Sequence, residues 1–221
     1  MKVTANIILG AKPEPYLKHC LDSIIPCVND TVIVANTHNQ NSDLIERYRM
    51  VRVIYKPFEN FAIARNHALD ESADADYILW VDADEVHFTE ELKRFINDVT
   101  SRNGIAGKAA FYHFVKDIKH YQSIDDRLIL LKNRTFRWVK AVDEYPEFPK
   151  GTKGDVIDTD YKYHHYGYTK PQRELWEGWM DRAKMLGEKN PWFADKDPDT
   201  ILDERKLIEY KGLYPEVMQC D

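Results

Sequence analysis

The chain contains 221 residues, of which 43% are hydrophobic and 31% are charged, a balance that is typical of a globular domain and excludes disorder and collagen-like repeats. Its net charge of −6 gives no broad positive surface for nucleic acid, and no apolar run approaches the roughly 20 residues of a transmembrane helix. The N-terminal apolar run is too short for a signal peptide, and the three cysteines, Cys20, Cys27 and Cys220, match no metal-ligand spacing, so we expect a cytoplasmic protein with reduced thiols.

Apolar patterns in the first half predict strands that alternate with helices. Short apolar runs indicate buried strands, and three- and four-residue spacing of apolar residues indicates helices. The expected strands are 3–9, 31–35, 51–55 and 77–81, and the expected helices are 14–25, 44–50, 62–72 and 90–99. This alternation is typical of a mainly parallel sheet that is covered on both faces. The sequence therefore predicts an α/β fold.

The pattern changes after about residue 104. Aromatic and β-branched runs predict shorter strands of mixed direction, and two later segments have helical spacing. The strands are expected at 109–115, 128–131 and 135–139, and the helices at 175–188 and 201–210. Because no linker separates the two sequence patterns, we predict one domain, 1–221, with two halves, 1–103 and 104–221.

The apolar run 77–81 leads directly into Asp82-Ala83-Asp84-Glu85. The pattern Asp-x-Asp occurs five times in the chain, but only this copy follows a wholly apolar predicted strand. Ligands of open α/β sheets bind outside the carboxyl ends of such strands. Two carboxylates at this spacing can face one pocket and suit Mg²⁺ or Mn²⁺, although a solvated acidic turn is the structural alternative. Asp82 and Asp84 are therefore candidate metal ligands.

Several segments together resemble family 2 glycosyltransferases of the GT-A fold. Residues 60–69 and 75–85 resemble the family's Ala-Arg-Asn helix and the strand that ends in Asp-x-Asp. Residues 6–25 match its opening, 138–144 resemble its Trp…Val-His-Glu segment, and 165–168 resemble its His-x-Gly-Tyr segment. The resemblance implies a Rossmann-like, mixed but mainly parallel sheet flanked by helices, with further helices at the C-terminus.

The activity implied by this resemblance is metal-dependent transfer of a sugar from a nucleoside-diphosphate sugar to an acceptor hydroxyl, with inversion. Residues 1–103 would bind the nucleotide-sugar, and residues 104–221 would bind the acceptor. A glycan, a lipid-linked compound or another hydroxyl compound is the expected acceptor, whereas the net charge gives no support to a nucleic acid. A lipid acceptor would be met by peripheral contact with a membrane.

By similarity, Asp82 and Asp84 would bracket the nucleotide-sugar and the divalent metal, Mn²⁺ or Mg²⁺. Arg65 would lie near the diphosphate or the first of these carboxylates. His165 would be a third metal ligand or a hydrogen-bond donor to the diphosphate. A surface arginine and a core histidine are the structural alternatives for these two residues.

The resemblance also implies a general base and a nucleotide contact. Glu144, or its neighbour Asp143, would accept the proton of the attacking hydroxyl, and the sequence leaves both open. Asn36 stands where family members often have the first Asp of an Asp-Asp-x-Ser-x-Asp loop. An amide can also pair with a base edge, but this departure leaves the identity of the nucleotide open.

Two other functions compete with glycosyl transfer. Residues 78–86 also resemble the signature of haloacid-dehalogenase-type phosphatases, in which Asp82 would be the nucleophile and Asp84 the general acid. Those proteins usually begin with this strand, whereas about 80 residues precede it here. The altered Asn36 loop also fits a non-catalytic nucleotide or carbohydrate binder that has kept the fold.

Overall fold

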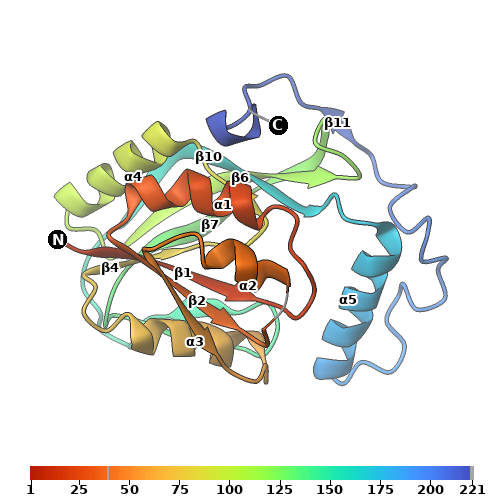
Figure 1. The fold of residues 1–221 in the computed structure, drawn as a ribbon, viewed down its shortest axis with the longest axis horizontal. Helices are drawn as coiled ribbons and strands as arrows, with labels where there is room; N and C mark the ends of the chain where they lie inside the picture. The colour runs from red at the N-terminus through yellow and green to blue at the C-terminus, as the bar shows by residue number, and fades with distance from the viewer. Residues whose placement is uncertain (39, 220–221) are drawn as a thin grey trace.

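A computed structural model describes residues 1–38 and 40–219 as a mixed sheet with helices on both faces (Figure 1). The strands follow the order β3-β2-β1-β4-β7-β6-β10-β5, and β11 pairs with β7 beside this path. Their bounds are β1 Val3–Leu9, β2 Asp30–Ala35, β3 Val51–Tyr55, β4 Tyr77–Trp80, β5 Glu85–Val86, β6 Ala106–Val115, β7 His120–Lys132, β10 Val156–Tyr168 and β11 Ile208–Glu209. A separate hairpin contains β8 Arg137–Val139 and β9 Tyr145–Glu147.

The helices cover the two faces of the sheet unequally. They are α1 Leu17–Ile24, α2 Gln40–Ile45, α3 Phe61–Glu71, α4 Thr89–Ser101 and α5 Gln172–Met185, with short 3₁₀ turns at Ile25–Cys27 and Glu216–Met218. In Figure 1, α1 and α4 lie on one face, α3 lies on the opposite face, and α5 stands to the side of the sheet. In the described part of the chain, no helix has the length and apolar character needed to cross a membrane.

The core explains why the early strands consist of continuous apolar runs. On β2, Ile33 packs in one core cluster with residues of α1 and α4. Its neighbours Val32 and Val34 pack on the other side of the sheet with Ala68 of α3. Successive side chains of a strand point to opposite faces, so a strand that is covered on both faces needs apolar residues at nearly every position.

The sheet topology brings three loops to one edge. Strands β2, β1 and β4 are parallel, with Leu9 opposite Ala35 and Asn6 opposite Trp80. The loops that follow these strands therefore begin at the same edge of the sheet. Beyond β4 the sheet becomes mixed, because β7 runs antiparallel to both β4 and β6.

Most of the predicted elements are confirmed, including all four strands of the first half. The helix expected at 44–50 is instead α2, which begins at Gln40 and ends at Ile45. The helix expected at 201–210 is wrong, because this segment forms turns followed by β11. Its apolar residues Ile201 and Leu202 pack beside α5, so burial and not helical periodicity explains their spacing. Cys20 and Cys27 are free thiols as predicted, and Cys220 lies outside the described residues.

Candidate active site

A cavity of about 650 Å³ opens at the edge where β1, β2 and β4 end, and α5 forms its far wall. All seven site residues expected from the sequence line this cavity: Asn36, Arg65, Asp82, Asp84, Asp143, Glu144 and His165. They come from the loops after β2 and β4, from α3, from the loop between β8 and β9, and from β10. The fold thus brings together side chains that are widely separated in the sequence.

A tight turn after β4 presents the two aspartates. The backbone N–H of Glu85 donates to the carbonyl oxygen of Asp82 at 3.0 Å. In return, the Glu85 carboxylate accepts from the backbone N–H of Asp82 at 2.9 Å. Glu85 is fully buried, so burial and the nearby Asp82 charge raise the pKa of its carboxyl to about 7 although Arg127 opposes this shift. The turn is therefore held by a buried carboxylate as well as by the backbone.

Two arginines engage both oxygens of Asp82. Arg65 donates through Nη2 to Oδ1, and Arg127 donates through Nη1 to Oδ2 at 2.8 Å. Arg127 also donates to Glu85 at 2.7 Å, and its guanidinium carbon lies 4.0 Å from the centroid of the Trp80 ring. Burial opposes ionisation of Asp82, but the two guanidinium groups outweigh it and hold the pKa of this carboxyl well below its usual range.

The two candidate bases lie on the same wall but in different environments. Glu144 accepts a hydrogen bond from Nε of Arg65 at 3.1 Å, and its side chain is only 10% exposed. Asp143 is exposed, and its backbone has a φ of +52°, a left-handed conformation that Asp and Asn tolerate better than most residues. Arg65 therefore orients Glu144 and not Asp143.

Asp84 lies among cationic groups on the opposite side of the turn. Its Oδ1 atom is 3.4 Å from Nε2 of His165, and its Oδ2 atom is 3.0 Å from Nζ of Lys170. Burial raises the pKa of Asp84, but His165 and Lys170 outweigh it and hold the pKa well below its usual range. Lys170 also contacts Glu14 at 2.6 Å. Burial and the Asp84 charge raise the pKa of Glu14 to about 7, against the effect of Lys170.

A chain of side chains extends from Asp84 into the sheet. Nδ1 of His165 lies 2.9 Å from Nδ1 of His113, and Nε2 of His113 lies 3.1 Å from Asp125. Burial and the neighbouring His165 lower the pKa of His113 to about 4. His165 is thus connected to a carboxylate at each of its two ring nitrogens, directly to Asp84 and through His113 to Asp125.

Asn36 connects the loop after β2 to the loop after β3 at the wall of the cavity. Its backbone N–H donates to the carbonyl of Leu9 at 3.1 Å, and its side-chain oxygen accepts from the backbone N–H of Phe58 at 2.9 Å. Pro57 and Phe58 both line the cavity. Asn36 therefore has a local structural partner in addition to its expected contact with a nucleotide.

Four residues of the site were not predicted from the sequence: Glu14, His113, Arg127 and Lys170. Arg127 lies on β7, but a register shift against β6 follows it, and the next buried residues, Ile129 and Leu131, pack in different core clusters, so strand alternation does not identify it. The other three have partners that are distant in the sequence, and no local pattern identifies them.

The donor chemistry of the site is compatible with a divalent cation that has few protein ligands. Among residues 1–38 and 40–219, no group of three or more His, Cys, Asp or Glu side chains is arranged to hold a metal ion. Asp84 and His165 nevertheless direct a carboxylate oxygen and a ring nitrogen to one place. A Cβ atom on Gly167 would lie 2.6 Å from Nε2 of His165 and 3.0 Å from Oδ2 of Asp84, so the glycine keeps the space beside both groups open.

Comparisons with known proteins identify the family of the chain. The family model of glycosyl transferase family 2 matches residues 8–151. The fold is also similar to crystal structures of S. aureus TarS, each with 13% identity and a TM-score of 0.49 over 86% of this chain. This chain spans 67% of TarS 1–349, 41% of TarS, and 68% of TarS 1–349 in complex with UDP-GlcNAc. A comparison with curated proteins gives no match. Because the family model covers more than half of the sequence, the chain belongs to glycosyl transferase family 2 and is a glycosyltransferase with the GT-A fold.

Proposed function

We propose that the chain transfers a sugar from a nucleoside-diphosphate sugar to an acceptor hydroxyl, with inversion and with help from a divalent cation. The observation that carries this proposal is that all seven residues expected from the family resemblance line one cavity. Residues 1–103 would provide the side that binds the nucleotide-sugar, and residues 104–221 would provide the side that binds the acceptor.

The charge of the site supports a divalent cation. Its ion pairs join five carboxylates (Glu14, Asp82, Asp84, Glu85 and Glu144) to four basic side chains (Arg65, Arg127, Lys170 and His165), so the acidic groups outnumber the basic ones by one. We assign the cation to Asp84 and His165, because Arg65 and Arg127 already engage both oxygens of Asp82. When bound, the cation would stabilise the negative charge of the departing diphosphate. Direct ligation by Asp82 stays a prediction.

Glu144 is the better placed of the two candidate bases. Its burial and its hydrogen bond to Arg65 hold the carboxylate on the cavity wall. In that position it accepts the proton of an acceptor hydroxyl while the oxygen attacks the anomeric carbon. Attack from the face opposite the leaving diphosphate gives inversion.

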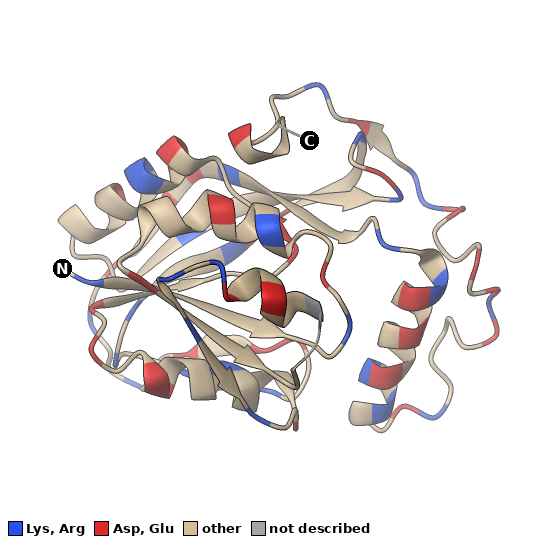
Figure 2. Ribbon diagram, viewed as in Figure 1, with Lys and Arg blue, Asp and Glu red and all other residues tan. Residues whose placement is uncertain are grey.

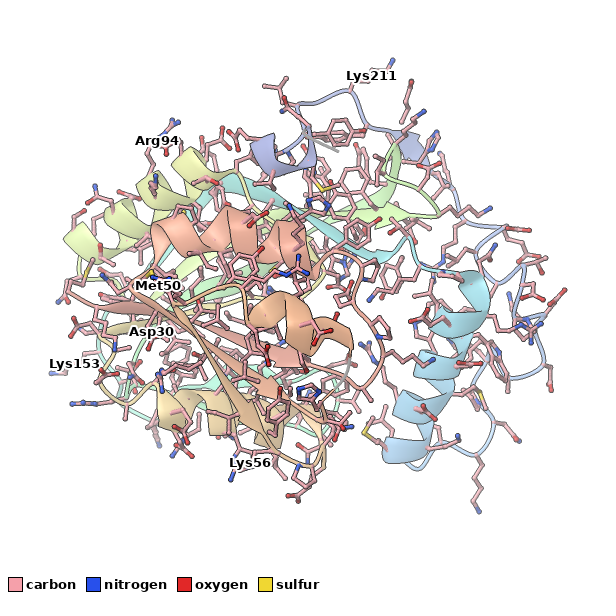
Figure 3. All side chains as sticks on the ribbon, in the orientation of Figure 1. Asp30, Met50, Lys56, Arg94, Lys153 and Lys211 are labelled. Atoms are coloured by element: carbon pink, nitrogen blue, oxygen red, sulfur yellow. The ribbon has the colours of Figure 1, made fainter. Side chains whose placement is uncertain are left out.

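One face of α5 provides the acceptor side of the cavity. It contributes Glu174, Leu175, Gly178, Trp179, Asp181, Arg182 and Met185. This mixture of an aromatic ring, apolar groups and charges of both signs suits an uncharged glycan better than a polyanion. Lys and Arg are interspersed with Asp and Glu over the molecule (Figure 2), and Arg94, Lys153 and Lys211 point outward from separate regions (Figure 3), so a nucleic acid acceptor gains no support. A lipid-linked acceptor, peripheral membrane contact and a cytoplasmic location stay predictions.

A thermal-shift panel of UDP, GDP, CMP, dTDP and their sugars, with and without Mn²⁺, tests the proposal. A ligand at about 100 times its Kd stabilises the folded state by about 2.7 kcal/mol, so the Tm of a domain of this size should rise by roughly 5–10 °C. The rise should require both Mn²⁺ and one nucleoside diphosphate. Asp84→Asn should abolish it, whereas Asp74→Asn, in an exposed Asp-x-Asp copy, should leave it unchanged.

Two results would contradict the proposal. The absence of any Tm shift with saturating nucleotides would contradict the proposed nucleotide-sugar site. A full Tm shift in Asp84→Asn would contradict the assignment of the cation to Asp84. A shift without transfer to any acceptor would instead favour the non-catalytic binder. The phosphatase alternative has lost its support, because the family match covers the whole segment around Asp82.

A further inference from the structure

Lys170 connects the two sides of the cavity. It lies in the short connection between β10 and α5, and its side chain is 16% exposed. Nζ lies 2.6 Å from Glu14, in the loop after β1, and 3.0 Å from Asp84, in the turn after β4. One ammonium group therefore links the α5 segment to two of the loops at the carboxyl edge of the sheet.

The ammonium of Lys170 has capacity for a further partner. An ammonium group has three N–H donors, and in the described part of the chain two of them are used, by Glu14 and Asp84. Lys170 and both carboxylates line the cavity. The neighbouring Gly167 leaves open the space beside Asp84 and His165, which a Cβ atom would fill. A ligand in this space would therefore contact the ammonium group.

The two arginines of the site are less suited to bind an incoming anion. Arg65 already donates to Glu144, to the carbonyl of Val81 and to Asp82. Arg127 donates to Asp82 and Glu85, and its guanidinium lies against Trp80. Both are held in fixed positions by carboxylates, whereas a lysine has a flexible stem and three rotatable donors.

We propose that Lys170 is a diphosphate-binding residue and that Glu14 competes with the diphosphate for its ammonium group. This inference rests on the proposed function, because it takes the diphosphate of a nucleotide-sugar as the anion. On binding, a phosphate oxygen takes the third donor of Nζ and competes with the Glu14 carboxylate for the positive charge, while Asp84 keeps its own contact. Binding of the nucleotide-sugar is thereby coupled to the loop after β1 and to the start of α5.

Two substitutions with opposite effects test this inference. Lys170→Met removes a charge-assisted hydrogen bond and should weaken binding by about 10- to 100-fold. Glu14→Gln keeps the shape of the side chain but removes the competing charge, so it should strengthen binding by about threefold to tenfold. The probe is inorganic pyrophosphate with Mg²⁺, titrated calorimetrically, because it tests the diphosphate contact independently of the nucleotide base.

Controls separate binding from folding and from the proposed function. Lys184→Met, at an exposed lysine of α5 that pairs with Asp181, should leave the pyrophosphate Kd unchanged. The double variant Lys170→Met, Glu14→Gln removes both members of the pair, so it should regain thermal stability but not pyrophosphate affinity. If Lys170 has only a structural role, both single variants lower the Tm and neither changes the Kd, and the inference is wrong. If the wild type binds neither pyrophosphate nor any nucleotide of the panel, the proposed function fails instead.

Discussion

The Nδ1 atoms of His165 and His113 lie 2.9 Å apart, so one of these nitrogens must carry the hydrogen that the other accepts. Nε2 of His113 lies 3.1 Å from Asp125, to which it can donate. With His113 neutral, as its pKa of about 4 implies, its Nδ1 is then the acceptor and His165 carries the hydrogen on Nδ1. Nε2 of His165 faces Asp84, which raises the pKa of this imidazole against the effect of burial, so this nitrogen keeps its proton for Asp84 until a bound cation takes its place.

This arrangement makes His113 a positioning residue for the proposed cation. Groups that fix the tautomer of a metal-ligating histidine typically contribute about 10- to 100-fold to metal affinity. His113→Ala should therefore weaken Mn²⁺ binding by about this factor, measured from the electron paramagnetic resonance signal of free Mn²⁺. His120→Ala is the matched control, because His120 also pairs with an aspartate but does so on the surface. Unchanged Mn²⁺ affinity in His113→Ala would contradict the tautomer argument.

The position of Glu144 predicts a separation of binding from transfer. Glu144→Gln retains a carbonyl oxygen for Nε of Arg65 but cannot take a proton. We expect the Kd of the nucleotide-sugar to stay within about twofold and the rate of transfer to fall by about 10²- to 10⁴-fold. Single-turnover transfer and calorimetric titration measure the two quantities.

Asp143→Asn provides the discriminating comparison, and Glu147→Gln, on the exposed side of β9, provides the control. Loss of transfer in Asp143→Asn, with Glu144→Gln still active, would assign the base to Asp143. Loss of nucleotide-sugar binding in Glu144→Gln would show that Glu144 acts on the position of Arg65 and not only as a base.

The fold could be predicted largely from local patterns, because β1, β2 and β4 are buried on both faces and must be apolar. The last third could not be predicted in the same way. Ile201 and Leu202 are buried because they pack against α5, so their spacing does not indicate that they form a helix. β10 shifts register against β6 in two places, and its exposed and buried residues therefore do not alternate regularly.

The residues of the candidate site also differ in whether the sequence identifies them. Asp82, Asp84 and Arg65 occur in short segments whose order along the chain identifies them. Lys170 meets Glu14 across 156 positions of sequence, and His165 meets His113 across 52. Such contacts arise only when the strands have paired, because neither partner has a local pattern that requires the other. The charge balance around the proposed cation could therefore not be predicted from the sequence.

Burial of His87 predicts a loss of stability at low pH. Its side chain is fully buried, Nδ1 contacts the hydroxyl of Tyr161 at 2.8 Å, and burial lowers its pKa to about 3 from 6.5. Between pH 3 and 6.5, His87 therefore binds a proton in the unfolded chain but not in the folded chain. Titration of His87 therefore does not change the free energy of unfolding above pH 6.5 and lowers it progressively as the pH falls toward 3.

The free energy of unfolding should consequently contain a term from His87 of about 1.4 kcal/mol per pH unit between about pH 5.5 and 4. His87→Gln should remove this term, and urea denaturation at several pH values measures it. Leu92→Ala, at a buried residue without a titratable group, should lower the free energy of unfolding equally at each pH. Parallel pH profiles for His87→Gln and the wild type would mean that His87 titrates alike in both states.

Gly178 offers a direct test of the proposed acceptor side of the cavity. It lies within α5, it lines the cavity next to Trp179, and a Cβ atom at this position would meet no atom within 4 Å. Gly178→Ala should therefore stabilise the folded chain by about 0.5–1 kcal/mol through helix propensity. It should leave the binding of the nucleotide-sugar unchanged, because the proposed cation and diphosphate contacts lie elsewhere on the wall.

Gly178→Leu retains the helix but fills part of the proposed acceptor space. If the acceptor passes along this face of α5, the KM for the acceptor should rise by about tenfold or more, since a misplaced reactant loses the benefit of orientation. The KM for the nucleotide-sugar and the Tm should stay close to those of Gly178→Ala. An unchanged acceptor KM in Gly178→Leu would show that the acceptor enters elsewhere, whereas a rise in both KM values would mean that the two substrates share this part of the cavity.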